Sequence, residues 1–307
     1  MEARRFAYVG WGNENMKGHF WVIIWTLATL LPGIGQESAV LRFDTMFTIK
    51  GTLKYNFMQF DQDISANNKI TSNRPLDLGI GFGYKDFSFG FSVNIPFLYD
   101  QNVSKSNSFD FGFNCFFRNA LFFEGLIKYY EGFHTEQFTL NGAEYGGEVG
   151  LKIIMSGISG EYLFNKEHSL RGIYNLDRKQ RISNASFILG GGVFYSALYS
   201  DDAYVDENNY NQHTIYFGPN AGYSYIWILS NNFFLNILCI LGINGSVKNN
   251  EFYFGFHALP KFAFGYHGVN WSFNAVITNT LLIAMQKIEF DNIINSGACS
   301  ITFSRRF

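Results

Sequence analysis

Large apolar residues alternate one by one with small or polar residues through residues 76–95. This stretch reads LDLGIGFGYKDFSFGFSVNI, and its two alternating runs meet at a short turn around Lys85 and Asp86. Successive side chains of a β-strand point to opposite faces of the sheet, so each run gathers its large side chains on one face. The stretch therefore predicts a β-hairpin with one strongly apolar face.

The second face of this hairpin carries glycine, serine and asparagine with few charges. A water-soluble sheet favours charged residues on its wet face. A lipid-facing strand instead alternates apolar residues with residues that face a lumen. The pattern predicts an all-β fold, a transmembrane antiparallel up-and-down β-barrel. A soluble secreted β-protein is the competing interpretation.

Alternating segments of this kind continue to the end of the sequence, separated by short turns and by longer polar stretches. Bacterial single-chain barrels have even strand numbers, so one of the thirteen candidates should not span. We expect the short candidate 169–174 to pair imperfectly or to fold inward, which leaves about 12 strands, with 10 or 14 as alternatives. Residues 61–73 and 131–147 are expected to be external loops. The candidates are 48–60, 76–84, 87–95, 109–117, 121–130, 149–165, 169–174, 185–198, 214–228, 233–244, 251–266, 269–284 and 297–307.

The two ends of the sequence carry targeting signals of different kinds. Met16 and Lys17 precede about a dozen apolar residues and then small residues, an order typical of a secretory signal peptide. We expect an upstream extension at 1–15, a signal peptide at 16–35 and one barrel domain at 36–307. At the other end, Phe303 and Phe307 lie on the apolar face of the last strand. They resemble the signal by which barrel-assembly machinery recognises outer-membrane proteins, and that machinery is an expected partner.

Composition narrows the possible functions. The chain has 19% aromatic and 16% charged residues and a formal net charge of -2, so its charge does not favour nucleic acid as a partner. Its three scattered cysteines predict neither a metal site nor a disulfide framework. The sequence has no Gly-x-Ser-x-Gly elbow and no His-x-x-x-His pair. We expect no catalytic residue, no cofactor and no metal.

Alternation also places ionisable residues on the face opposite the large apolar side chains. A lysine or arginine at the bilayer midplane costs roughly 2–4 kcal/mol on the lipid side, so these residues are expected to face the lumen. If they pair across the barrel they hold a narrow interior closed, and if they line a wide one they tune its selectivity. The lumen-facing candidates are Glu124, Lys128, Glu161, Arg171, His257 and Lys261.

Three segments carry a resemblance to a known family. Residues 73–133, residues 157–201 with GISGEYLFNKEHSLRGIY and SFILGGGVFYSALYSD, and GPNAGYSYIWIL at 218–229 are similar to uncharacterised Bacteroidota outer-membrane proteins grouped as domain-of-unknown-function family 4421. The resemblance implies a barrel in a membrane and supplies no activity.

These observations lead to an expected location and three possible roles. We expect the mature chain in the bacterial outer membrane, in contact with outer-membrane lipid and lipopolysaccharide. A small barrel with a structural or partner-binding role comes first, and a passive pore or small-solute channel is the alternative. A lipid- or peptide-modifying enzyme is a distant third possibility, because the sequence offers no catalytic constellation.

Overall fold

The computed structural model describes residues 39–43, 47–61, 69–73, 76–95, 107–117, 120–140, 143–200, 210–230, 232–248, 251–286 and 289–307. All of them fall within the unit Ser38–Phe307. The expected upstream extension at 1–15 and the signal peptide at 16–35 lie outside the described residues. No helix in the described ranges has the length and apolarity needed to cross a membrane.

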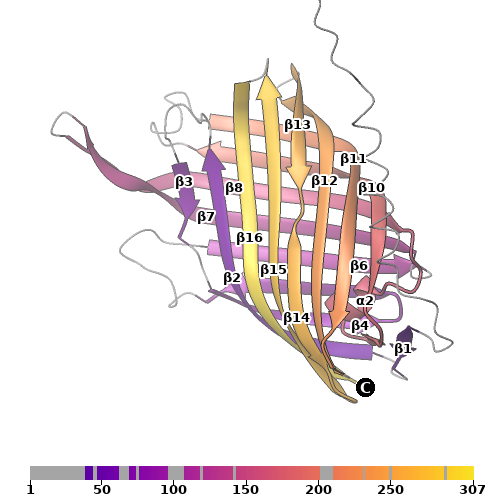
Figure 1. The fold of residues 1–307 in the computed structure, drawn as a ribbon. Coiled ribbons are helices and arrows are strands. Elements are labelled where there is room, and N and C mark those ends of the chain that lie inside the picture. The colour runs from indigo at the N-terminus through magenta and orange to yellow at the C-terminus, as the bar shows by residue number, and fades with distance from the viewer. Residues whose placement is uncertain are drawn as a thin grey trace, which may run out of the picture. The chain divides into compact units, whose positions relative to one another are not determined.

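Antiparallel strands pair with their neighbours along the chain and close into a ring (Figure 1). The seam is formed by the last strand, β16 (Glu289–Arg306), which pairs with β2 (Phe47–Asp61). Between them, in chain order, lie β4 (Leu76–Tyr84), β5 (Phe87–Asn94), β6 (Asn107–Phe117), β7 (Leu121–Leu140), β8 (Ala143–Leu163), β10 (Asn184–Ser200), β11 (Tyr210–Ile228), β12 (Phe233–Lys248), β13 (Glu251–Ala258), β14 (Lys261–His267) and β15 (Trp271–Gln286).

Strands β13 and β14 occupy one place in the ring, because both pair with β12 on one side and β15 on the other. The chain is interrupted between them at Leu259 and Pro260, where proline lacks the N–H that a continuous ladder requires. The described strands therefore fill twelve positions in the ring. The predicted up-and-down barrel of about 12 strands is confirmed.

The two faces of the barrel wall separate as the alternation predicts. The hairpin at 76–95 forms β4 and β5, with Leu78 opposite Val93 and Phe82 opposite Phe89. These four side chains are exposed on the outer face, whereas Asp77 and the other alternating residues of β4 face inward and are buried. Burial inside the ring and exposure outside it are the arrangement of a barrel that lies in lipid.

One expected strand candidate folds as a helix. Residues 169–174 become the short helix α2 (Leu170–Tyr174), whose N-cap Ser169 accepts a hydrogen bond from the Gly172 N–H at 3.1 Å. After α2 in the chain, β9 (Arg178–Gln180) pairs with β1 (Val40–Arg42) in a separate two-stranded sheet outside the ring. Leu170 and Ile173 are buried, so the candidate folds inward. Arg171, which was expected on a strand, lies on this helix instead.

We call residues 164–183 the plug and the end of the barrel that holds them the plug end. Figure 1 shows α2 and β1 at the end of the ring where the C-terminus lies. Tyr174 reaches the barrel wall, where its hydroxyl donates to Asn236 Oδ1 of β12 at 2.9 Å. The end of β10, the start of β11, the end of β12 and the start of β13 lie at the other end, which we call the loop end.

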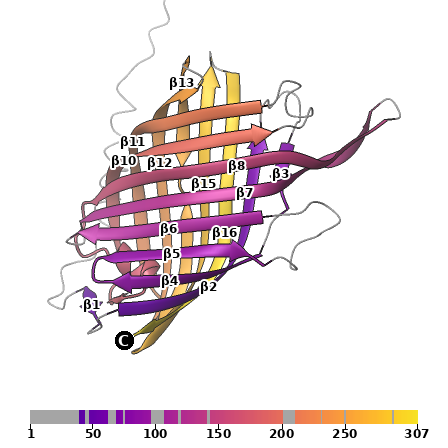
Figure 2. The ribbon, with the colours of Figure 1, turned by 180° about the vertical axis from the view of Figure 1, so that it is seen from behind.

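The expected loops at 61–73 and 131–147 contain paired strands, so the prediction of loops was wrong for these strand residues, and their external position stays a prediction. Strand β3 (Lys69–Ser72) lies within the first, and β7 and β8 continue as one hairpin through the second. In Figure 2 this hairpin extends beyond the neighbouring strands. Register shifts at Glu131/Phe133 and Thr135/Phe138 mark β-bulges in it. A bulge interrupts the two-residue period, which explains why the alternation was not visible there.

Strand β3 also narrows the barrel at the loop end. It pairs with β2 on one side and β7 on the other, above the level at which β4, β5 and β6 end. One strand replaces three at this level, and barrel diameter grows with strand number. The ring is therefore narrower at the loop end than at its middle.

The interior near the loop end is filled by apolar side chains. Phe60 of β2, Phe133 of β7 and Leu151 of β8 are fully buried. They belong to one cluster that draws members from most of the ring strands, including Ile70 of β3. A packed cluster of this kind excludes water from that part of the lumen.

Candidate functional site in the lumen

Two ion pairs connect strands that are not neighbours in the ring. Lys261 of β14 pairs with Glu124 of β7, and Lys54 of β2 pairs with Asp110 of β6. On the shorter path around the ring, β8, β10, β11 and β12 separate β7 from β14. The first pair therefore crosses the lumen and joins opposite walls.

Lys128 of β7 lies between these two pairs. Its ammonium group donates to Ser296 Oγ of β16 at 2.9 Å, and both Asp110 and Glu124 are close enough to interact with its charge. Charges of alternating sign therefore run across the interior. We call this set the charge ladder, and it consists of Lys54, Asp110, Lys128, Glu124 and Lys261.

Two further buried carboxyl groups flank the ladder. Asp77 accepts hydrogen bonds from Asn56 Nδ2 at 2.5 Å and from Ser108 Oγ at 2.8 Å. Glu161 of β8 is buried within range of the Lys261 charge. Buried charges need partners. Asn56 and Ser108 supply them for Asp77, whereas neither carboxylate oxygen of Glu161 has a hydrogen-bond partner among the described residues.

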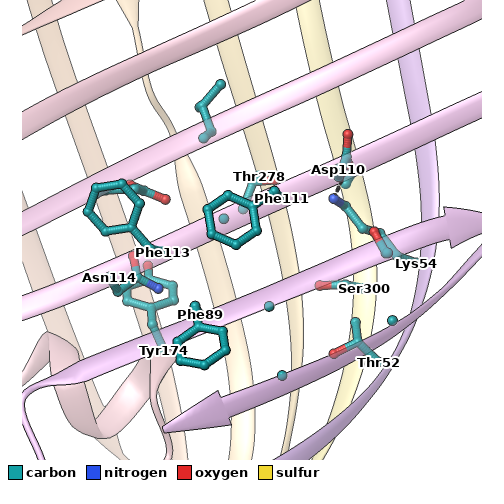
Figure 3. Close-up of a pocket in the computed structure, with 18 of the residues that line it drawn as sticks. Thr52, Lys54, Phe89, Asp110, Phe111, Phe113, Asn114, Tyr174, Thr278 and Ser300 are labelled. Atoms are coloured by element: carbon teal, nitrogen blue, oxygen red, sulfur yellow. Dashed lines mark hydrogen bonds and ion pairs between the residues drawn. The ribbon is translucent and has the colours of Figure 1, made fainter. Parts of the chain in front are cut away.

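A cavity of about 300 Å³ is lined by the charge ladder and by Tyr174 of the plug. Figure 3 shows the Lys54–Asp110 pair and Tyr174 on different sides of it. Lys50 also lines the cavity, and its ammonium donates to Ser88 Oγ at 2.7 Å. Glycines and hydroxyl side chains supply much of the remaining wall, among them Thr52, Gly81, Gly112, Ser159, Ser300 and Thr302.

The plug is attached to the wall by a buried hydrogen-bond chain centred on His168. The His168 Nδ1 lies 2.9 Å from Asn184 Oδ1 of β10, and its Nε2 lies 2.9 Å from Ser224 Oγ of β11. Ser224 Oγ accepts in turn from Asn236 Nδ2 of β12 at 2.9 Å. A neutral imidazole with its proton on Nδ1 fits all of these contacts, because Nε2 then accepts from the serine. Burial lowers the pKa of His168 to about 4.

A second attachment holds the plug to the turn between β4 and β5. The Arg171 Nε donates to Asp177 Oδ2 at 2.6 Å, and the same guanidinium pairs with Asp86 and donates to the Lys85 carbonyl. On the facing wall, Asn274 Nδ2 of β15 donates to the Ile173 carbonyl at 2.8 Å. The plug is thus held from several sides of the ring.

The structure brings together three of the six lumen-facing candidates. Glu124, Lys128 and Lys261 form most of the charge ladder, and Glu161 lies beside it. Arg171 is at the plug end, and His257 is buried near the Phe194 ring, 6.1 Å between ring centroids. Sequence reasoning missed Lys50, Lys54, Asp77 and Asp110, although the same alternation places each of them on the inner face.

The two residues expected to form an assembly signal, Phe303 on β16 and Phe307 directly after it, lie on the outer face of the barrel. Phe303 stacks on Trp271 at 5.9 Å between ring centroids, and Phe307 stacks on Phe47 at 5.1 Å. Both phenylalanines are about half exposed. Within the described ranges no group of histidine, cysteine and carboxylate side chains could hold a metal ion.

The comparison with protein families identifies the group to which this sequence belongs. The model described as "Domain of unknown function (DUF4421)" matches residues 40–307. The chain belongs to this family. For this DUF4421 protein, the matched region includes the plug and every strand of the ring.

Three solved structures are similar to this DUF4421 protein over most of its length. The translocator domain of autotransporter NalP from Neisseria meningitidis has a TM-score of 0.45 at 12% identity, with 95% of this chain and 96% of that chain covered. The β domain of the Bordetella autotransporter BrkA has a TM-score of 0.44 at 8% identity, with 86% and 100% covered. OmpT, an outer membrane protein of Vibrio cholerae, has a TM-score of 0.35 at 9% identity, with 89% and 100% covered. No curated protein matches the sequence.

Proposed function

We propose that this chain is an integral outer-membrane barrel with a closed lumen and a structural or partner-binding role. The observation that carries the proposal is that the interior is occupied at three levels. Apolar side chains fill the narrowed loop end, the charge ladder crosses the middle, and the plug is bonded to the wall at the other end. An ion that crossed this barrel would have to displace all three.

The outer surface supports the membrane location. Apolar residues cover it on every side of the ring, from Phe89 and Phe91 on β5 to Ile277 on β15 and Ile301 on β16. In this proposal they contact outer-membrane lipid and lipopolysaccharide, and the plug end faces the periplasm. The β7–β8 hairpin then extends on the external side, where it is the part of the barrel best placed to meet a partner.

The experiment is conductance of the refolded mature protein, residues 36–307, in a planar bilayer. Heat-modifiable gel mobility establishes that the barrel has folded. We expect a silent membrane for the wild type. A variant with Phe60→Ser, Phe133→Ser and Leu151→Ser, which removes the packing at the loop end, is expected to give discrete steps or a raised leak. Reproducible steps from the folded wild type would contradict the closed lumen.

A passive channel for ions or small solutes is the second candidate function. The cavity of about 300 Å³ favours it, because its wall is rich in hydroxyl groups and charges that could replace hydration water. In this case the wild type conducts, and Lys128→Ala alters the ratio of cation to anion permeability. The two functions are therefore separated by the same measurement.

A further inference from the structure

A second, smaller cavity lies at the plug end, between the plug and the start of β2. It measures about 90 Å³ and is separate from the lumen cavity. We call it the plug-end pocket. Space of this size holds several waters, and so it has room for a tetrahedral oxyanion. Its lining residues are Arg42, Phe43, Phe47, Thr48, Gly83, Lys85, Arg171, Asp177 and Arg178.

The charges around the plug-end pocket do not balance. Four cationic side chains line it, and one carboxylate, Asp177, lies among them. Asp86 adds a second carboxylate through its ion pairs with Arg171 and Arg178. Among the described residues two positive charges remain in excess. The side chains of Arg171 and Arg178 are about nine-tenths buried and pair with these carboxylates, whereas Arg42 and Lys85 are exposed. An excess of cationic side chains around a pocket favours an anion.

Two buried polar atoms of the pocket residues have no hydrogen-bond partner among the described residues. They are the Thr48 hydroxyl oxygen and Asp177 Oδ1. The other carboxylate oxygen of Asp177 is bound by Arg171. Unsatisfied buried groups in a native structure call for a missing water or ion. These two differ in kind, because the hydroxyl can donate a proton and the carboxylate oxygen can only accept one.

We propose that the plug-end pocket binds a phosphate group that carries a proton, either inorganic hydrogen phosphate or a phosphate monoester. Arg42 and Lys85 supply the charge, and the Thr48 hydroxyl donates to a phosphate oxygen. Asp177 Oδ1 accepts the P–OH proton. Sulfate at neutral pH has no proton to give, so the same carboxylate repels it. This site is independent of whether the lumen conducts.

Isothermal titration calorimetry on the refolded chain in a non-ionic detergent tests the site. The titrants are sodium phosphate and sodium sulfate at pH 6 and equal ionic strength, because a phosphate monoester has its second pKa near ~6. We expect phosphate to bind and sulfate to bind at least about tenfold more weakly. Sulfate cannot make the hydrogen bond from P–OH to Asp177, and the loss of one charge-assisted hydrogen bond has an effect of about this size. Equal binding of the two anions, or no binding of phosphate, would overturn the proposal.

Two variants assign the roles of the unpartnered atoms. Thr48→Val keeps the shape of the side chain and is expected to weaken phosphate binding about tenfold. Thr52→Val is its matched control, since Thr52 lies on the same strand outside the pocket and bonds Thr302. Asp177→Asn is expected to bring the phosphate-to-sulfate ratio close to one. Unchanged phosphate affinity in Thr48→Val, with gel mobility that shows a folded barrel, would exclude the hydroxyl from the site.

Two further titrants distinguish a phosphate monoester from a phosphate diester as the bound group. Glycerol 3-phosphate, a monoester, is expected to bind like inorganic phosphate. Dimethyl phosphate, a diester without an ionisable second proton, is expected to bind like sulfate. Equal binding of the diester and the monoester would point to a phospholipid-type headgroup held by charge alone and would contradict the role of Asp177.

Discussion

At the scale of single residues, the plug depends on an uncharged histidine. His168 sits in the buried chain from Asn184 to Ser224, where both ring nitrogens have partners. Burial favours the neutral ring and lowers the pKa. It outweighs the hydrogen bond to Asn184, which acts in the opposite direction.

This lowered pKa predicts a pH dependence of stability. The pKa of His168 is about 4 in the folded protein and 6.5 for a histidine in the unfolded chain. Between these two pH values the unfolded state therefore binds more protons than the folded state. The free energy of unfolding therefore falls as the pH drops from 6.5 toward 4, by about 2 kcal/mol between pH 7 and pH 5. Urea unfolding in detergent at both pH values measures it. His168→Gln should lose this part of the pH dependence, and His213→Gln on the outer wall controls for the loss of an imidazole.

A second prediction at this scale concerns a glycine in the β7–β8 hairpin. Gly132 has a φ of 92°, in the region that only glycine adopts without cost, and it lies at the first bulge. Gly132→Ala should destabilise the barrel by about 1–2 kcal/mol. Gly51→Ala is the control, because a Cβ at Gly51 meets no atom within 4 Å. Equal urea midpoints for the two variants would show that the bulge tolerates a side chain.

At the scale of elements, the sequence could predict which face a residue occupies but not which residue it meets. Alternation placed Glu124 and Lys261 on the inner face, because a lipid-facing charge is costly. Their contact depends on the closure of the ring and on the height of each strand, and neither leaves a local signal. The helix α2 has five residues, too few for a helical period to appear. The β7–β8 extension was hidden by its bulges.

The Glu124–Lys261 pair gives the prediction at this scale. Removing one partner of a buried ion pair leaves the other charge unpaired, whereas removing both does not. Lys261→Met should therefore lower the free energy of unfolding by roughly 3 kcal/mol. The double variant Glu124→Gln/Lys261→Met should recover part of that loss. A double-mutant cycle by urea unfolding measures the coupling, and a double variant less stable than Lys261→Met would contradict the pairing.

At the scale of the whole molecule, the two ends of the barrel are closed by different means. The loop end narrows because β3 replaces three strands, and apolar packing fills it. At the plug end, a separate segment is held by hydrogen bonds and ion pairs to many strands. The partners of the plug come from β2 through β15, so its full set of contacts requires the closed ring.

The seam ends at Phe307, and this leads to a prediction about assembly. The Phe307 N–H donates to the Phe47 carbonyl at 3.0 Å, and the two rings stack at 5.1 Å. Deleting Phe307 removes the last pair of the seam and the terminal aromatic side chain expected to be read during insertion. We expect the heat-modifiable form in the membrane fraction to fall severalfold. Phe307→Tyr, which keeps the ring, should assemble normally.

Deleting Phe307 removes both apolar surface that contacts lipid and the terminal aromatic residue expected to act as an assembly signal. A control variant is needed to tell these two effects apart. Phe256→Ala on β13 removes an outward ring of similar exposure away from the terminus, so it reports the cost of lost lipid contact alone. If deletion of Phe307 lowers the folded fraction no more than Phe256→Ala does, the terminal residue acts only as part of the lipid-facing surface. A much larger loss, with Phe307→Tyr unaffected, would mean that the terminal aromatic ring is required before the seam can close.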